Sequence, residues 1–291
     1  MLSDLFLLVA CRSGKHRRRW FGPLFEQIAR RTGHVEGWTF MNYGYARKGL
    51  PETCRLDPDE EAERYCAQLY HRVVDGIELD GKDVVEVSCG RGGGAAYLRR
   101  HFTPRSVTGI DIAPAAVAFC RRVHKVPGLR FIQGDAEALP AFDQSCDVVV
   151  NVEAASLYED PARFFAEVER VLRPGGIFLF ADLCFPHEVP GLRAALAASG
   201  LQMVDEDDIA DNVSHGLELD AARRSAAVRE IVPWPLRGLA KVFVGAPGTR
   251  FPTLFASGRI YYRCFVLRKA ESTPAPSSQL DQIETAIPAL A

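Results

Sequence analysis

The chain has 291 residues, of which 47% are hydrophobic and 25% are charged, and these proportions exclude an intrinsically disordered protein. Its formal net charge of −2 gives no general attraction to nucleic acid, so we expect no nucleic-acid partner. No apolar run approaches the roughly 18 residues that a transmembrane helix needs. The eight cysteines are scattered without a C-x-x-C pair, which indicates reduced thiols in a cytoplasmic protein and predicts no metal site.

The N-terminal region, residues 1–70, precedes the first predicted strand and looks helical, and we expect it to cap the mouth of the ligand site. Within it, residues 15–20 read KHRRRW and are flanked by apolar residues. Two interpretations stay open for this segment. It could be a basic helix that rests on an anionic membrane surface, or an amphipathic helix that packs its apolar stripe on the core.

Residues 84–94 read VVEVSCGRGGG and carry the strongest functional signal in the chain. The run 84–87 is apolar with one acid, Glu86, which is typical of a buried parallel strand. A glycine-rich turn containing Gly90 and Gly92 follows, and then a helix-like segment. Strand, glycine-rich turn and helix in this order present backbone amides to a bound nucleotide.

Two acids follow at the spacing that a nucleoside ligand requires. Asp111 ends a second apolar strand, and an acid about 20 residues beyond the glycine loop can accept hydrogen bonds from both ribose hydroxyls. Asp135 ends a third strand and could receive the exocyclic amine of adenine. A dinucleotide-dependent dehydrogenase would satisfy the first two of these elements equally well.

The later strands complete an open sheet. Residues 147–156 predict a fourth strand ending near Asn151, residues 171–183 a fifth, and two further strands fall near 200–206 and 259–269. In an open α/β sheet the ligand binds at the carboxyl ends of the strands, where these polar residues lie. We therefore predict an α/β fold, a doubly wound, mostly parallel sheet of seven strands with a Rossmann-like arrangement.

The main domain is predicted over residues 71–270, interrupted by an insertion at 206–258 that we expect to form a lid over the acceptor. The insertion carries an arginine pair that either binds a diphosphate or forms a solvated helix face. Its aromatic residues either offer an apolar wall to a large substrate or anchor the insertion to the sheet. The pair is Arg223 and Arg224, and the aromatic residues are Trp234, Phe243, Phe251 and Phe255. Residues 271–291 are rich in Pro, Ser and Ala and are expected to be a mobile tail.

The strings GDAEALP, DVVVNVEA and VLRPGG decide between the nucleotide-binding classes, because together they resemble class I S-adenosylmethionine-dependent methyltransferases over residues 65–185. The strings EVSCGRGGG, LYHR, VPGLRF, NVEA and AEVERVLRPGG are more specifically similar to the mycobacterial phthiotriol/phenolphthiotriol dimycocerosates methyltransferases. Those enzymes O-methylate a hydroxyl on a long lipid. The resemblance implies S-adenosyl-L-methionine as the cofactor and a large, apolar small-molecule acceptor.

The resemblance also implies roles for individual residues. The methionine part of the cofactor is expected at the first strand and glycine loop, the ribose at the end of the second strand, the adenine at the end of the third, and Asn151 beside them. A segment N-Y-G-Y folds over the cofactor in related enzymes, which places Tyr43 at the methionine end. One departure is plain, since Ser88 stands at the first glycine of the usual E-x-G-x-G-x-G pattern. The expected contacts are Glu86, Ser88, Gly90 and Gly92 for the methionine part, Asp111 and Ile112 for the ribose, and Asp135 and Ala136 for the adenine.

The catalytic base is the least certain element of the site, because an alcohol is a poor nucleophile unless a base removes its proton. The similar enzymes carry a histidine after the fourth strand, where this chain has Ser156, a weak base. The candidates to replace it are Glu153 at the strand edge, His187 after the fifth strand and His215 in the lid insertion.

The sequence thus predicts an S-adenosylmethionine-dependent methyltransferase that O-methylates a hydroxyl of a polyketide or lipid-like secondary metabolite. Two alternatives stay open. The missing histidine would suit C-methylation of an activated carbon or prenyl chain, and it would also suit a methyltransferase-fold cyclase or ligand-binding protein that transfers no methyl group.

Overall fold

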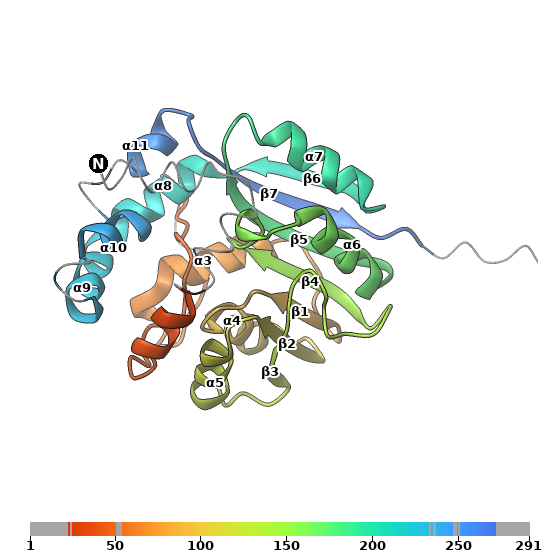
Figure 1. Cartoon of the computed structure of the whole chain (residues 1–291), viewed down its shortest axis with the longest axis horizontal. Coiled ribbons are helices and arrows are strands. Elements are labelled where there is room, and N and C mark those ends of the chain that lie inside the picture. The colour runs from red at the N-terminus through yellow and green to blue at the C-terminus, as the bar shows by residue number, and fades with distance from the viewer. Residues whose placement is uncertain are drawn as a thin grey trace, which may run out of the picture.

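The computed structural model describes residues 23, 25–50, 54–232, 234, 237–246, 249 and 251–271, and within them a seven-stranded sheet forms the centre of the protein (Figure 1). The strand order is β3-β2-β1-β4-β5-β7-β6, and β7 runs antiparallel to both of its neighbours. This arrangement confirms the predicted doubly wound, mostly parallel sheet. The strands are β1 Asp83–Val87, β2 Ser106–Asp111, β3 Leu129–Gln133, β4 Cys146–Val152, β5 Leu172–Cys184, β6 Gln202–Asp208 and β7 Tyr261–Arg268.

Successive residues of each central strand face opposite sides of the sheet, and both sides are covered by helices. In β4, Val148 and Val150 join the core beneath α3, α4 and α5, whereas Val149 joins the core beneath α6 and α7. The second core is rich in phenylalanine, and Phe178, Phe180 and Phe265 stack in sequence across β5 and β7. The covering helices are α3 Arg64–Val73, α4 Gly93–His101, α5 Pro114–Val123, α6 Pro161–Val171 and α7 Val189–Ala198, with short 3-10 turns at η1 Glu61–Glu63 and η2 Ala155–Leu157.

The described residues of the insertion between β6 and β7 form four helices that gather at one end of the molecule (Figure 1). They are α8 Ala210–Leu219, α9 Ala221–Ile231, α10 Arg237–Phe243 and α11 Phe251–Ala256. The inserted part begins later than residue 206, because β6 continues to Asp208. No described helix is long and apolar enough to cross a membrane.

The N-terminal region is helical only in part. Residues 25–31 and α3 are helical, but the described residues between them form turns and irregular chain up to η1. Residues 38–46, WTFMNYGYA, form a stretch without helix or strand, bent at Asn42, that we name the strap. The basic segment 15–20 and residues 272–291 lie outside the described residues.

The strap crosses from the glycine loop to the inserted helices. At its first end, Nε of Arg91 donates to the carbonyl of Trp38 at 2.5 Å, and the Gly93 amide donates to the carbonyl of Thr39 at 3.1 Å. At its far end, the amide of Ala46 donates to the carbonyl of Asn212 in α8 at 3.1 Å. The strap therefore links the first half of the sheet to the inserted helices.

Candidate active site

The loop after β1 has a backbone conformation that ordinarily selects glycine. Ser88, Gly90 and Gly92 have φ angles of +58°, +54° and +78°. At Gly92 a Cβ atom would also lie 2.8 Å from the ring of Phe131, so no larger residue fits there. At Ser88 the left-handed conformation costs roughly 1–2 kcal/mol for a residue with a side chain, and this is the physical meaning of the departure from the usual pattern. Its Oγ forms a hydrogen bond with the phenol of Tyr158 at 2.7 Å, which offsets part of that cost.

Glu86 lies at the end of β1 with an unsatisfied oxygen. Its side chain is buried, and Tyr70 Oη donates to Oε1 at 2.5 Å. In the described part of the chain no residue hydrogen-bonds Oε2. Burial raises the pKa of Glu86 to about 8. A buried acceptor without a partner fits a cationic donor such as the ammonium group of the cofactor's methionine part.

Asp111 is fixed by backbone amides on both of its oxygens. The Gly90 amide donates to Oδ2 at 2.8 Å and the Ala113 amide to Oδ1 at 2.9 Å. Burial raises the pKa of Asp111 to about 6. A carboxylate has about four acceptor positions, so both oxygens retain capacity for ribose hydroxyls. The next residue, Ile112, is 48% exposed and offers an apolar surface beside them.

The predicted adenine residues lie next to Asp111. The Gly134 amide donates to the carbonyl of Asp111 at 3.0 Å, which brings the end of β3 against the end of β2. Oδ1 of Asp135 accepts from the Glu137 amide at 3.0 Å, and Ala136 is buried between them. The structure therefore gathers these predicted residues at one sheet edge.

Asn151 and Tyr43 lie at this edge with contacts that the sequence does not reveal. The amide nitrogen of Asn151 donates to the carbonyl of Val87 at 2.9 Å and to Tyr158 Oη at 2.8 Å, so this side chain ties β4 to β1. Its Oδ1 is buried and without a partner among the described residues. Tyr43 is buried, and its backbone amide, rather than its phenol, forms the contact to Glu153.

Glu153 lies at the carboxyl end of β4 in a constrained setting. It follows β4 with a φ of +53°, an unusual conformation for a glutamate that stores strain at this point. Its Oε1 accepts from the Tyr43 amide at 2.9 Å and from Tyr262 Oη at 2.9 Å. Burial of the carboxyl group raises the pKa of Glu153 to about 8, and the residue as a whole is half-buried. These contacts hold the carboxyl group in one orientation, while neither described donor reaches Oε2.

The other three candidate catalytic residues have different surroundings. Ser156 lies in η2 close behind Glu153, and its amide donates to Asp182 Oδ2 at 2.9 Å. His187 is exposed and stacks on Phe185, with no hydrogen bond or ion pair to a described residue. His215 lies on α8, where its Nδ1 is 3.7 Å from Glu218. Glu153, by contrast, is hydrogen-bonded to the strap through the Tyr43 amide.

The arginine pair of the insertion differs from both of its sequence interpretations, whereas Phe255 agrees with the interpretation that the aromatic residues anchor the insertion. Arg223 and Arg224 form ion pairs with the buried Asp220, at 2.5 and 2.9 Å, so they are neither a solvated face nor free for a diphosphate. Trp234 is 80% exposed, whereas Phe255 packs in the core. The side chains of Phe243 and Phe251 lie outside the described residues.

Sequence reasoning missed Tyr262 and Tyr70 as members of the site. Tyr262 lies near the start of the antiparallel strand β7. The rule that ligands bind at the carboxyl ends of parallel strands does not predict a site residue there. Tyr70 lies in the LYHR string of α3 and packs against the start of α4, where a Cβ at Gly94 would lie 2.1 Å from its ring. The glycine at position 94 was the sequence signal that a bulky side chain packs there.

A seven-stranded sheet with β7 reversed, a glycine loop after β1 and acids ending β1 and β2 define a class I S-adenosylmethionine-dependent methyltransferase. In agreement, residues 85–180 match the family model described as a methyltransferase domain. The crystal structure of the [4+2]-cyclase SpnF superposes with a TM-score of 0.65 at 18% identity, covering 87% of this chain and 96% of that one, which shows the shared fold.

Two curated relatives narrow the assignment. A probable phthiotriol/phenolphthiotriol dimycocerosates methyltransferase 2 of Mycobacterium ulcerans is 43% identical over 210 residues, covering 72% of this chain and 81% of the relative. A fatty-acid O-methyltransferase of Mycolicibacterium smegmatis is 42% identical over 198 residues, covering 68% and 72%. The chain belongs to the phthiotriol/phenolphthiotriol dimycocerosates methyltransferase family, and its cofactor is S-adenosylmethionine.

Proposed function

We propose that this enzyme O-methylates a hydroxyl group of a long, apolar, lipid-like acceptor, and that Glu153 is the general base. The observation that carries the proposal is the environment of Glu153, a carboxyl group with a pKa of about 8 at the ligand edge of the sheet. A base with a pKa near the working pH combines a useful ionised fraction with enough proton affinity to assist an alcohol.

The roles of the surrounding residues follow from their contacts. S-adenosylmethionine supplies a methyl group on a positively charged sulfur, which an oxygen nucleophile can attack in line. Tyr43 and Tyr262 hold Oε1 of Glu153, so Oε2 faces the acceptor and takes its hydroxyl proton. Glu86, Asp111 and Asp135 orient the cofactor along the sheet edge, and the strap restricts water at the methionine end.

The names of the relatives support a lipid-like acceptor but disagree about its reacting group, since one is named for phthiotriol lipids and one for fatty acids. A fatty-acid carboxylate needs no base, whereas an alcohol does. The presence of Glu153 as a base therefore favours a hydroxyl group as the methyl acceptor. The engagement of Arg223 and Arg224 by Asp220 disfavours a prenyl diphosphate.

The test uses Glu153→Gln with a phthiotriol dimycocerosate lipid and palmitic acid as alternative acceptors. We expect turnover of the lipid alcohol to fall by about 10²–10⁴-fold, while calorimetric affinity for S-adenosylhomocysteine stays unchanged. Glu230→Gln, an exposed glutamate on α9, is the control. Product mass reports the transferred methyl group. Methylation of palmitic acid alone, or an alcohol turnover that survives the substitution, would overturn the proposal, and a product of unchanged mass would favour a cyclase.

We further propose that the protein works in the cytoplasm, with an N-terminal cap over residues 1–70, a methyltransferase domain over 71–270 and a lid in the inserted helices. The seven cysteines within the described residues are all free and buried, which supports a reducing compartment. Peripheral membrane contact through residues 15–20 would bring the enzyme to a lipid acceptor.

A further inference from the structure

We propose that Arg224 is a positioning residue for the general base, acting on Glu153 through the single peptide group that joins Asn42 to Tyr43. The inference rests on the proposed role of Glu153. Arg224 lies on α9, and the chain positions 42 and 224 are brought together only by the fold.

The peptide group between Asn42 and Tyr43 is bonded on both of its sides. Its carbonyl accepts a hydrogen bond from Nη2 of Arg224 at 2.9 Å, and its N–H donates to Oε1 of Glu153 at 2.9 Å. In a trans peptide the carbonyl and the N–H point in opposite directions. The guanidinium and the carboxyl group therefore lie on opposite sides of the strap, joined by one polarisable unit.

This arrangement stabilises the ionised carboxylate of Glu153, which is the form that can accept a proton. A cation bonded to a peptide carbonyl makes the N–H of the same peptide a stronger donor, because bonded groups in series polarise one another. That N–H stabilises the ionised carboxylate of Glu153 against the burial that raises its pKa. The charged and titratable groups facing Glu153 are Tyr43 of the strap, Tyr70 of α3, Tyr262 of β7, Asp182 of β5 and Arg224 of α9, and Arg224 is the cation among them.

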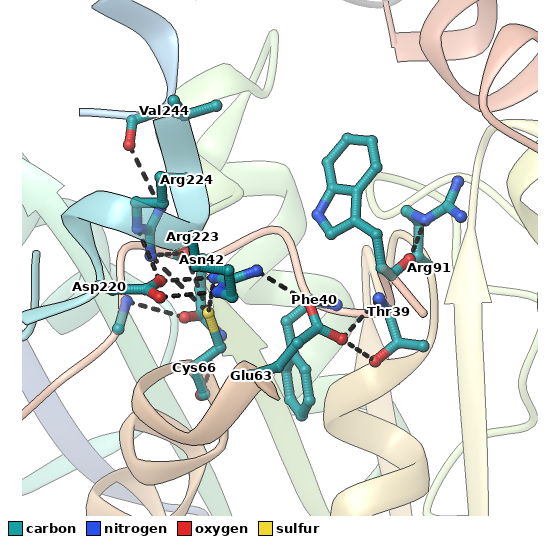
Figure 2. Close-up of polar contacts among 12 residues, drawn as sticks. Thr39, Phe40, Asn42, Glu63, Cys66, Arg91, Asp220, Arg223, Arg224 and Val244 are labelled. Atoms are coloured by element: carbon teal, nitrogen blue, oxygen red, sulfur yellow. Dashed lines mark hydrogen bonds and ion pairs between the residues drawn. The ribbon is translucent and has the colours of Figure 1, made fainter. Parts of the chain in front are cut away.

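Arg224 is itself held in place. It is 7% exposed, its Nε pairs with Asp220 at 2.9 Å, and its Nη1 donates to the carbonyl of Val244 beyond α10 at 3.2 Å. Figure 2 shows Arg224 beside Asn42, with Asp220 and Val244 on its other sides. A guanidinium with this many fixed contacts can orient a peptide, which a flexible lysine at the surface could not do.

The peptide is also prevented from rotating. The side-chain nitrogen of Asn42 donates to the carbonyl of Cys66 in α3 at 3.1 Å, and its Oδ1 accepts from the Gly44 amide at 2.8 Å. Gly216 of α8 packs so closely that a Cβ there would lie 2.8 Å from the nitrogen of Tyr45. Arg224 thus acts on a peptide that has one available orientation.

The test is a double-mutant cycle of Arg224→Met and Glu153→Gln in the phthiotriol lipid assay. We expect Arg224→Met to lower kcat roughly 10- to 100-fold, with little change in the KM for S-adenosylmethionine, and to move the rising limb of the pH–rate profile to higher pH. Adding Arg224→Met to Glu153→Gln should cause no further loss, because the base through which Arg224 acts is already absent.

Arg223→Met is the matched control for the pH profile, since Arg223 pairs with the same Asp220, and with Glu63 at 3.6 Å, but does not bond the peptide between Asn42 and Tyr43. Its pH profile should stay in place. Arg223 continues to pair with Asp220 in the Arg224 variant, which favours folding, and thermal melting checks it. Should Arg224→Met not fold, Arg224→Lys, which retains the charge without the fork of donors, replaces it in the cycle.

Losses that multiply in the double variant, or an unshifted pH profile in the single one, would overturn the positioning role of Arg224. Full activity of Glu153→Gln alone would instead overturn the general base, so the two failures are distinguishable.

Discussion

At the scale of single residues, Ser88 shows how the glycine pattern of this fold can be departed from. The position requires a φ near +58°, and a small side chain is tolerated because its Oγ finds the Tyr158 phenol. The requirement is thus for a left-handed backbone and a small volume, rather than for glycine itself.

Replacing Ser88 with glycine should therefore change little. The substitution removes strain of roughly 1 kcal/mol, but it loses a hydrogen bond of about 1 kcal/mol and adds freedom to the unfolded chain. We expect unfolding free energy within about 1 kcal/mol of the parent and unchanged affinity for S-adenosylhomocysteine. Ser88→Val, with a β-branched side chain at positive φ, should destabilise the protein and weaken cofactor binding in calorimetry. Equal behaviour of the two variants would show that the conformation of this loop is not what selects the residue.

At the scale of elements, the strap is attached to the site by a buried acid. Glu63 of η1 accepts from the Thr39 amide at 2.7 Å, from Thr39 Oγ1 at 2.6 Å and from the Phe40 amide at 3.2 Å. The next residue, Met41, lies over the glycine loop, since a Cβ at Gly90 would be 3.3 Å from its sulfur. Figure 2 shows Thr39 and Phe40 directed toward Glu63, between Arg91 and the α9 arginines.

We accordingly expect Glu63→Gln to weaken cofactor binding. An amide can accept on its oxygen only, so at least one of these three donors would face another donor, at a cost of about 1–3 kcal/mol. Affinity for S-adenosylhomocysteine should fall about tenfold in calorimetry. Glu61→Gln, which alters an exposed pair with Arg64 in the same turn, is the control. An unaltered affinity in Glu63→Gln would mean that the strap does not belong to the cofactor site.

At the scale of the whole molecule, the sheet could be predicted because each strand is recognised from a short stretch of the sequence. The first two parallel strands are apolar runs, and the order of residues along the chain places Glu86, Asp111 and Asp135 at or just after the carboxyl ends of β1, β2 and β3. The contacts of Arg224 and Tyr262 could not be predicted in this way. They join positions more than 100 residues apart, and a buried arginine on a helix has the same local pattern as a solvated one.

The same folding that assembles the site also gives the protein a characteristic dependence of stability on pH. Burial raises the pKa values of Glu86 and Glu153 to about 8 and that of Asp111 to about 6, from ordinary values near 4. A carboxyl group whose pKa is raised by folding contributes stability at low pH, which is lost as the pH rises from its unfolded to its folded pKa. Asp83 acts in the opposite sense, because Arg105 and Arg173 lower its pKa, so its contribution is lost as the pH falls below about 4.

Thermal melting of the ligand-free protein should therefore occur at a lower temperature at about pH 8 than at about pH 5, with the loss accumulating between these values. Glu86→Gln should reduce this loss, since it removes one of the carboxyl groups whose ionisation burial opposes. Conversely, a ligand with an ammonium group beside Oε2 of Glu86 favours ionised Glu86, so S-adenosylhomocysteine should bind more tightly as the pH rises toward about 8. A melting temperature that is constant across this window would show that burial does not oppose the ionisation of these acids, and the unsatisfied oxygen of Glu86 would no longer mark the cofactor's methionine end.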